Sequence, residues 1–163
     1  MKSPASKLFS HLFFRLVLAT GFMLSAGSAQ AQLLLSCNIA SAPPMAFGGY
    51  NPLLFANHDA QTSMNVRCTG LGIAILRISM GTGLAGTVGA RVMQRNGVYL
   101  PYGLYTNSGR TTTWGDGTAG TTVVQRLVFT GTDFSLPIYG RIPQRQNVPV
   151  GLYTDNVTIR LDF

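Results

Sequence analysis

The sequence has 163 residues, enough for one ordinary domain, and only 10% of them are charged. Lys and Arg number 12 against 5 Asp and Glu, apolar types make up 46%, and glycine fills 19 positions. This length excludes a multidomain enzyme. Intrinsic disorder is excluded because disordered chains combine low hydrophobicity with high net charge. The composition therefore predicts one folded domain with a hydrophobic core.

The N-terminus has the layout of an export signal. Three basic residues flank or precede an apolar stretch over residues 16–24, and Ala29-Gln30-Ala31 follows as a cleavage site. The uninterrupted apolar run falls short of the roughly 20 residues that cross a bilayer, which favours a cleaved signal over a membrane anchor. We expect a signal peptide over residues 1–31, export through the periplasm, and a mature domain over residues 32–163 without a transmembrane segment.

Cleavage would change the charge of the chain. Three of the 12 basic residues lie in the predicted signal; the nine that remain are all Arg, against five Asp, for a net charge of +4. These arginines are scattered singly, as in Leu76-Arg77-Ile78, whereas nucleic-acid binding calls for a clustered basic stripe. We therefore expect no nucleic-acid partner. Lys and Glu are missing after residue 31 while Gly, Thr and β-branched residues are plentiful, which favours strands and turns.

Cys37 and Cys68 are the two cysteines of the sequence. In an exported chain such a pair predicts a disulfide, and closing a loop of about 32 residues stabilises a fold by roughly 3 to 4 kcal/mol. Two free thiols, or half of a metal site, is the weaker alternative. His58 is the only histidine after the predicted signal, so a zinc site would lack ligands. We expect no metal and no cofactor.

In chain order, an apolar run over residues 33–39 is followed by strands predicted over residues 62–69, 73–80, 90–95, 98–106, 122–130, 136–142 and 155–163. Asn96-Gly97 predicts a tight hairpin between two of them. Pro101 predicts that the second strand of this hairpin lies at a sheet edge or carries a bulge. Seven or eight short strands separated by turns predict an all-β sandwich or barrel.

Side chains suited to catalysis are few. A nucleophile needs an oriented base, and His58 beside Asp59 in a polar segment is more typical of a solvated pair. The five aspartates fall in no recognisable catalytic motif. We expect no catalytic residue and no enzyme activity.

Trp114 and Asp116 form the most suggestive surface constellation. An indole beside a carboxylate, with Tyr99, Tyr102 and Tyr105 nearby in sequence, could stack on a sugar ring. The favoured alternative is that Trp114 plugs the core while Asp116 starts a turn, because Trp is usually buried.

Seven motifs follow one another along the chain: Cys37-x-Ile39, Met45-Ala46-Phe47-Gly48-x-Tyr50-Asn51-Pro52, Val66-x-Cys68-Thr69, Leu100-Pro101-Tyr102-x-Leu104-Tyr105, Trp114-Gly115-Asp116-Gly117, Tyr139-Gly140-Arg141 and Gly151-Leu152-Tyr153-x-Asp155-x-Val157-Thr158. In this order they resemble the spore coat protein U domain, which is shared by subunits of archaic, Csu-type chaperone-usher pili. The resemblance extends from Cys37 to Phe163.

The resemblance implies an incomplete immunoglobulin-like β-sandwich that lacks its last strand. A periplasmic pilus chaperone would lend a strand to the open groove, and a neighbouring pilus subunit would replace it after passage through an outer-membrane usher. Residues 155–163 would then be the groove edge, with four alternating side chains facing the groove: Val157, Ile159, Leu161 and Phe163. A plain core strand is compatible with the same alternation. The implied function is a structural or adhesive subunit at the cell surface, active in attachment and biofilm formation.

The N-terminal segment departs from this pattern. Only five residues, Gln32 to Ser36, separate the predicted cleavage site from Cys37, and they span at most about 17 Å. A donor strand filling a whole groove needs roughly ten residues, about 33 Å. Leu33 and Leu35 offer two pocket-filling side chains, so we expect a chain that accepts a strand but donates poorly. The alternative is a self-standing secreted carbohydrate-binding or coat module with a complete sandwich, in which Trp114 and Asp116 make the contact.

Overall fold

The computed structural model describes residues 34–163, so the predicted signal peptide and Leu33 lie outside the described residues. The described chain forms eight strands and one short 3₁₀ turn. These are β1 (Ser36–Ser41), β2 (His58–Thr69), β3 (Ile73–Met80), the turn η1 (Gly83–Ala85), β4 (Arg91–Arg95), β5 (Val98–Tyr105), β6 (Val124–Phe129), β7 (Asp133–Ile142) and β8 (Ile159–Asp162). The predicted all-β class is confirmed.

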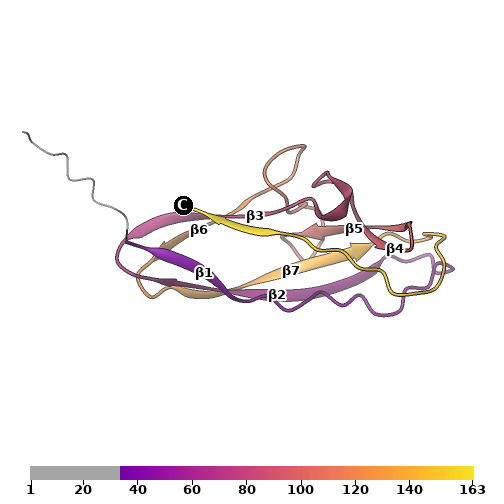
Figure 1. Ribbon diagram of the computed structural model, residues 1–163, viewed down its shortest axis with the longest axis horizontal. Coiled ribbons are helices and arrows are strands. Elements are labelled where there is room, and N and C mark those ends of the chain that lie inside the picture. The colour runs from indigo at the N-terminus through magenta and orange to yellow at the C-terminus, as the bar shows by residue number, and fades with distance from the viewer. Residues whose placement is uncertain (1–33) are drawn as a thin grey trace, which may run out of the picture. The chain divides into compact units, whose positions relative to one another are not determined.

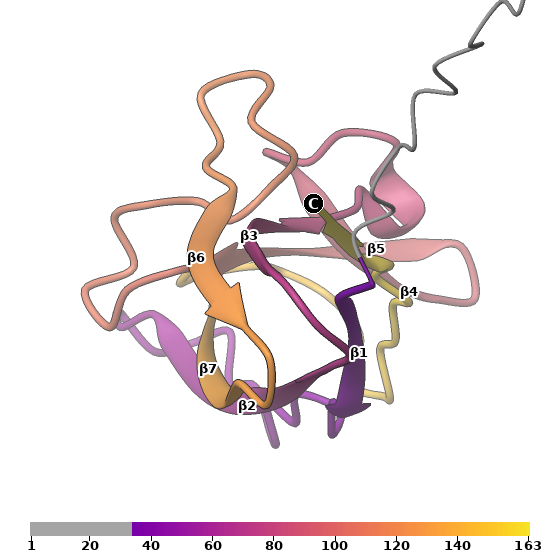
Figure 2. The same ribbon diagram turned by 90° about the vertical axis from the view of Figure 1, so that its left-hand side faces the viewer.

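The strands form two sheets that face each other across one core. One sheet has the order β1-β2-β7-β5-β4, and the other has the order β6-β3-β8. Figure 1 shows β3, β6 and β8 above β1, β2 and β7, and Figure 2 shows the same two layers from one end. All named strand pairs are antiparallel. The domain is therefore a two-sheet sandwich of the immunoglobulin-like kind.

The core follows from the period of two in the strands. Alternate residues of β2, β3 and β7 are buried between the sheets: Met64, Val66, Cys68, Leu76, Ile78, Met80, Leu136, Ile138 and Ile142. Trp114 joins them at 1% exposure, and its Nε1–H donates to the carbonyl oxygen of Ile78 at 2.9 Å. Burial of an indole with its one polar atom satisfied is the usual arrangement for Trp in a core.

Several strand predictions need correction. β2 begins at His58, four residues before the predicted start, because the polar segment ahead of Thr62 pairs with the end of β7, His58 lying opposite Ile142. β5 is not an edge strand, since it lies between β4 and β7. Pro101 is tolerated there because the β5–β7 ladder begins only at Gly103, so its missing N–H interrupts no hydrogen bond to β7.

The predicted closing strand is shorter than its alternation indicates. Only Ile159–Asp162 forms a ladder, with β3. The residues before it bond to other elements: Thr154 exchanges two backbone hydrogen bonds with Gln94 of β4, and the Thr158 carbonyl accepts from Gly81 N. The segment therefore passes from the edge of one sheet to the edge of the other, which no single ladder can follow.

The predicted disulfide is confirmed. Cys37 of β1 and Cys68 of β2 are direct partners in the ladder, and their sulfurs are bonded. Two pairs further on, β1 carries a bulge, because Ile39 pairs with Val66 but Ser41 pairs with Asn65, which leaves Ala40 as the extra residue. β1 is thus bonded covalently to β2 near its start and interrupted by a bulge near its end.

Candidate functional site

Two strands on one side of the sandwich have an unpaired edge. β1 pairs only with β2, and β8 pairs only with β3, among the residues that the structure describes. Figures 1 and 2 both place these strands on the same side, one in each layer. We call this side the open flank, with β1 as one wall and residues 153–163 as the other. An unpaired edge presents backbone N–H and C=O groups that can pair with an added strand.

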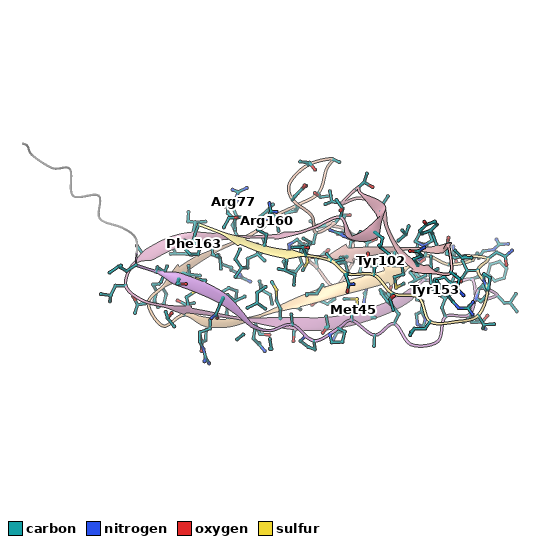
Figure 3. All side chains as sticks on the ribbon, viewed as in Figure 1. Met45, Arg77, Tyr102, Tyr153, Arg160 and Phe163 are labelled. Atoms are coloured by element: carbon teal, nitrogen blue, oxygen red, sulfur yellow. A yellow bond between two sulfur atoms is a disulfide. The ribbon has the colours of Figure 1, made fainter. Side chains whose placement is uncertain are left out.

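The side chains of the open flank are apolar and incompletely covered. Tyr153, Val157, Ile159 and Leu161 pack against the core but remain half-buried. Phe163 is 53% exposed at the end of this row. Three of the four predicted edge side chains therefore lie together against the core, and the fourth extends beyond them. In Figure 3, Met45 and Tyr153 lie toward the end of the domain opposite Phe163.

One member of this row is polar, and sequence reasoning gave it no role. Asp155 accepts a hydrogen bond from the Tyr102 hydroxyl at 2.6 Å and another from Leu84 N at 2.9 Å. Gly83 has φ +60°, and a Cβ there would overlap the Asp155 carboxylate, so this close approach requires glycine. We call Asp155, Tyr102 and Gly83 the carboxylate anchor. Its signal in the sequence is that Tyr102 and Asp155 both fall within the quoted motifs.

A buried arginine lies next to the carboxylate anchor. Arg91 is 1% exposed, and its Nε and Nη2 donate to the carbonyl oxygens of Gly81 and Met80 at 2.8 and 3.2 Å. Burial lowers the pKa of the Arg91 guanidinium. Burial, and then the hydrogen bond to Asp155, raises the pKa of Tyr102 above its ordinary value, so this phenol stays a neutral donor. These groups fix the chain just ahead of β8.

Trp114 and Asp116 do not form the surface constellation that sequence reasoning offered for them. Trp114 is buried, and the exposed Asp116 accepts from the backbone N and the hydroxyl of Thr118 at 2.9 and 2.6 Å. These two hydrogen bonds lower the pKa of Asp116. Tyr99 is exposed while Tyr102 is buried. The prediction of a sugar-stacking surface on Trp114 is therefore wrong, and the favoured alternative, with Trp114 in the core and Asp116 at a turn, is confirmed.

His58 and Asp59 point to opposite faces of β2, as neighbouring strand residues do. The Nε2–H of His58 donates to the carbonyl oxygen of Phe47. Asp59 accepts from Arg141 Nε and Nη2 at 2.7 and 2.9 Å and lies 3.1 Å from Arg110 Nη1. The hydrogen bonds from Arg141 lower the pKa of Asp59. The two residues form no catalytic pair, and residues 34–163 contain no group of three metal-ligating side chains.

The model of the Spore Coat Protein U domain family matches residues 23–160. The chain belongs to this family. It is 34% identical over 146 residues to Protein U of Myxococcus xanthus, and the matched region covers 78% of each of the two chains.

A solved structure shares the fold of this spore coat protein U domain. It is the pre-assembly complex of CsuC and CsuE, a chaperone and a tip adhesion subunit of archaic chaperone-usher Csu pili of Acinetobacter baumannii. The TM-score is 0.57 and the identity 24%, over 80% of this chain and 40% of the matched chain. The spore coat protein U domain thus spans about two fifths of that chain.

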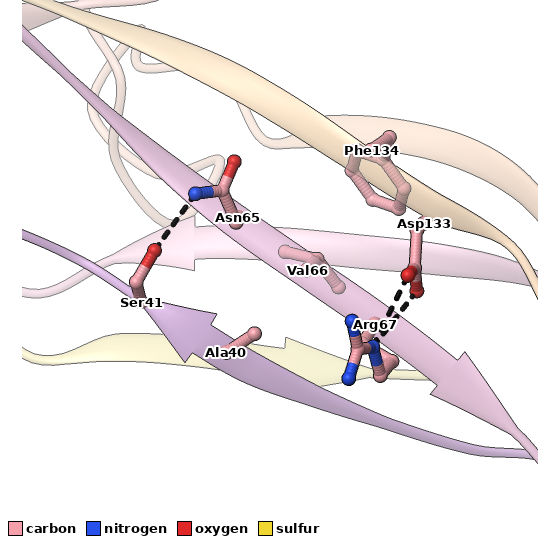
Figure 4. Close-up of a pocket in the computed structure, with 7 residues that line it drawn as sticks. All are labelled: Ala40, Ser41, Asn65, Val66, Arg67, Asp133 and Phe134. Carbon is pink, nitrogen blue, oxygen red and sulfur yellow. Dashed lines mark hydrogen bonds and ion pairs between the residues drawn. The ribbon is translucent and has the colours of Figure 1, made fainter.

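The spore coat protein U domain also has a shallow pocket of about 410 Å³ over β1, β2 and β7, shown in Figure 4. Asn65 Nδ2 donates to Ser41 Oγ at 2.7 Å on one side of it. On the other side Arg67 pairs with Asp133 at 3.1 Å. The polar groups at this site bond to each other.

No helix within residues 34–163 is long and apolar enough to cross a membrane.

Proposed function

We propose that this spore coat protein U domain is an exported subunit of a chaperone-usher surface fibre, and that it accepts a strand from another protein along the open flank. The observation that carries the proposal is the pair of unpaired edges, β1 and β8, with a row of half-buried apolar side chains along residues 153–161. It acts by strand exchange and not by catalysis. Attachment to surfaces and biofilm formation are the roles that we propose for the assembled fibre.

The added strand would complete both the hydrogen bonding and the core. Its backbone would pair with β8, and its alternate side chains would cover Val157, Ile159 and Leu161. The wall from Tyr153 to Phe163 is about 33 Å long at 3.3 Å per residue, which matches a donor segment of roughly ten residues. A periplasmic chaperone would supply this strand first, and another fibre subunit would supply it after transfer at an outer-membrane usher.

We propose that the chain is an acceptor and not an effective donor. Leu35, one of the two candidate donor side chains, is 3% exposed in the core of its own domain. β1 begins at the next residue. With cleavage after Ala31, only three residues would precede Leu35. Such a subunit suits a terminal position in a fibre.

Co-expression with the cognate chaperone tests the proposal. The full chain is expressed with its signal, with and without the chaperone, and the soluble periplasmic protein is quantified. We expect a soluble chaperone complex in the first case and degradation or aggregation in the second. A stable, soluble monomer without chaperone would contradict an incomplete sandwich.

A matched pair of variants locates the binding edge. Phe163→Asp places a charge at the exposed end of the open flank, and Leu127→Asp places one on the outer face of β6, where the side chain is similarly exposed. Recovery of the chaperone complex should fall about tenfold for Phe163→Asp, because an unpaired charge would be desolvated by the added strand. Leu127→Asp should be recovered like the wild type. Equal recovery of both would speak against the open flank as the binding edge.

A further inference from the structure

One end of the domain displays apolar side chains with little cover. Leu53 and Phe55 are 81% and 77% exposed in the connection between β1 and β2, and Val150 and Leu152 are 93% and 81% exposed in the connection between β7 and β8. Leu54 is also exposed. Figure 1 shows these connections at the end of the domain away from the start of β1. We call Leu53, Leu54, Phe55, Val150 and Leu152 the apolar end.

The connections at the apolar end are tied to each other. The Tyr50 hydroxyl donates to the Pro143 carbonyl at 3.0 Å and accepts from Gln146 N at 2.6 Å. Gln144 N donates to Asn57 Oδ1 at 3.1 Å.

Two arginine side chains also contact these connections. The Arg145 guanidinium lies 4.7 Å from the centre of the Phe55 ring, and Gly151 packs closely against the side chain of Arg95. The apolar side chains are therefore presented by an ordered scaffold, and two arginines border them. Because the connections that carry these side chains are joined at one end of the domain, we treat the apolar end as a candidate interaction site.

The direction of β8 indicates what covers the apolar end. The C-terminal chain leaves this end at Leu152, bonds to β4 at Thr154, and runs along the open flank to Phe163 beside the start of β1, as Figure 1 shows. A strand added to β8 is more stable antiparallel, the arrangement that β3 already has with β8. Such a strand runs from Phe163 toward Leu152. Its C-terminal end, and the folded domain that follows it, therefore arrive at the apolar end.

We propose that the apolar end is the docking surface for the folded body of the subunit whose strand occupies the open flank. This inference rests on the proposed function and adds a second contact to it. The partner face is apolar with an acidic border that complements Arg95 and Arg145. Because strand and body belong to one molecule, the body contact acts at high effective concentration once the strand is seated.

Site-specific photo-cross-linking tests whether strand and body belong to the same molecule. Benzoylphenylalanine replaces Phe163 in one chain, Phe55 in a second, and Leu127, an exposed residue of β6 at the sheet edge away from β8, in a third. Each full chain is expressed in the native host, and sheared surface fibres are irradiated. We expect the Phe163 and Phe55 positions to cross-link the same fibre subunit, and the Leu127 position to cross-link it at least about tenfold less.

The outcomes separate this inference from the proposed function. If the Phe163 position cross-links no chaperone or subunit, the proposed function and the inference both fall. If the Phe163 position cross-links a subunit and the Phe55 position does not, the inference alone is overturned.

A double variant gives a second, independent readout. Leu53→Ser with Val150→Ser is compared with Ile73→Ser with Leu127→Ser, which removes two exposed apolar side chains from the paired β3–β6 surface. We expect the first variant to be recovered with its chaperone like the wild type but to enter fibres about tenfold less, and the second to enter them normally. Normal entry of the first variant into fibres, with or without a loss of surface attachment, would overturn the inference.

Discussion

The two walls of the open flank are held in different ways. β1 is joined to β2 by the Cys37–Cys68 disulfide within its ladder. β8 has a four-residue ladder with β3 and depends on the carboxylate anchor at Asp155 for its position. One wall is fixed covalently, and the other by a few hydrogen bonds. We infer that β8 is the wall that adjusts when a strand is added, while β1 gives it a constant frame.

Removing the disulfide should cause the largest loss of stability among the changes that distinguish the two walls. Cys37→Ser with Cys68→Ser frees β1, and we expect a loss of roughly 3 to 4 kcal/mol in the free energy of unfolding, because a closed loop of about 32 residues is released in the unfolded chain. Urea unfolding of the purified chaperone complex measures the loss. Wild-type protein under reducing conditions is the control and should show the same shift; no shift in either would mean that β1 needs no covalent support.

Breaking the carboxylate anchor should have a smaller effect, confined to the other wall. Tyr102→Phe removes the hydroxyl that donates to Asp155, and a lost hydrogen bond to a charged acceptor costs about 1.5 to 3 kcal/mol. Amide hydrogen exchange should then speed up in Ile159–Asp162 and not in β1. Tyr99→Phe, in which the altered tyrosine is exposed, is the matched control. Faster exchange in both walls would remove the distinction between them.

Replacing Asp59 should cause the smallest loss of stability, because this residue joins β2 to β7 away from both walls. Hydrogen bonds from Arg141 lower the pKa of Asp59, so the folded state is stabilised above the ordinary Asp pKa, and this stability is lost as the pH falls through the lower folded value. Asp59→Asn should cost less than about 1 kcal/mol at neutral pH, since the pair is partly solvated. Plotted against pH, the free energies of unfolding of variant and wild type should begin to approach each other below about pH 4, the ordinary Asp pKa. Curves that stay parallel down to pH 2 would contradict this origin.

Local patterns predicted those features that depend on neighbours in sequence. The alternation after Asp155 placed Val157, Ile159 and Leu161 on one face, and they pack together against the core. Asn96-Gly97 predicted the turn between β4 and β5, where both residues have positive φ. The lone cysteine pair predicted the link between β1 and β2.

Features that depend on contacts between residues far apart in the chain could not be predicted from the sequence. Tyr102 and Asp155 are 53 positions apart, and nothing local marks them as partners. The start of β2 is polar and becomes a strand only because β7 lies beside it. The exposure of Val150 depends on how two connections pack, which hydrophobicity alone does not tell. Tertiary pairing, and not local propensity, decided each of these.

The bulge at Ala40 bears on unwanted polymerisation. A long, regular, exposed edge strand templates uncontrolled sheet growth between copies of a protein. Here one edge is interrupted where Ile39 and Ser41 pair with consecutive residues of β2, and the other has only four residues in its ladder. Neither edge alone is a good template for amyloid-like stacking. The strand addition that we propose therefore requires a partner segment long enough to pair along all of residues 153–163, which distinguishes such a segment from a chance contact.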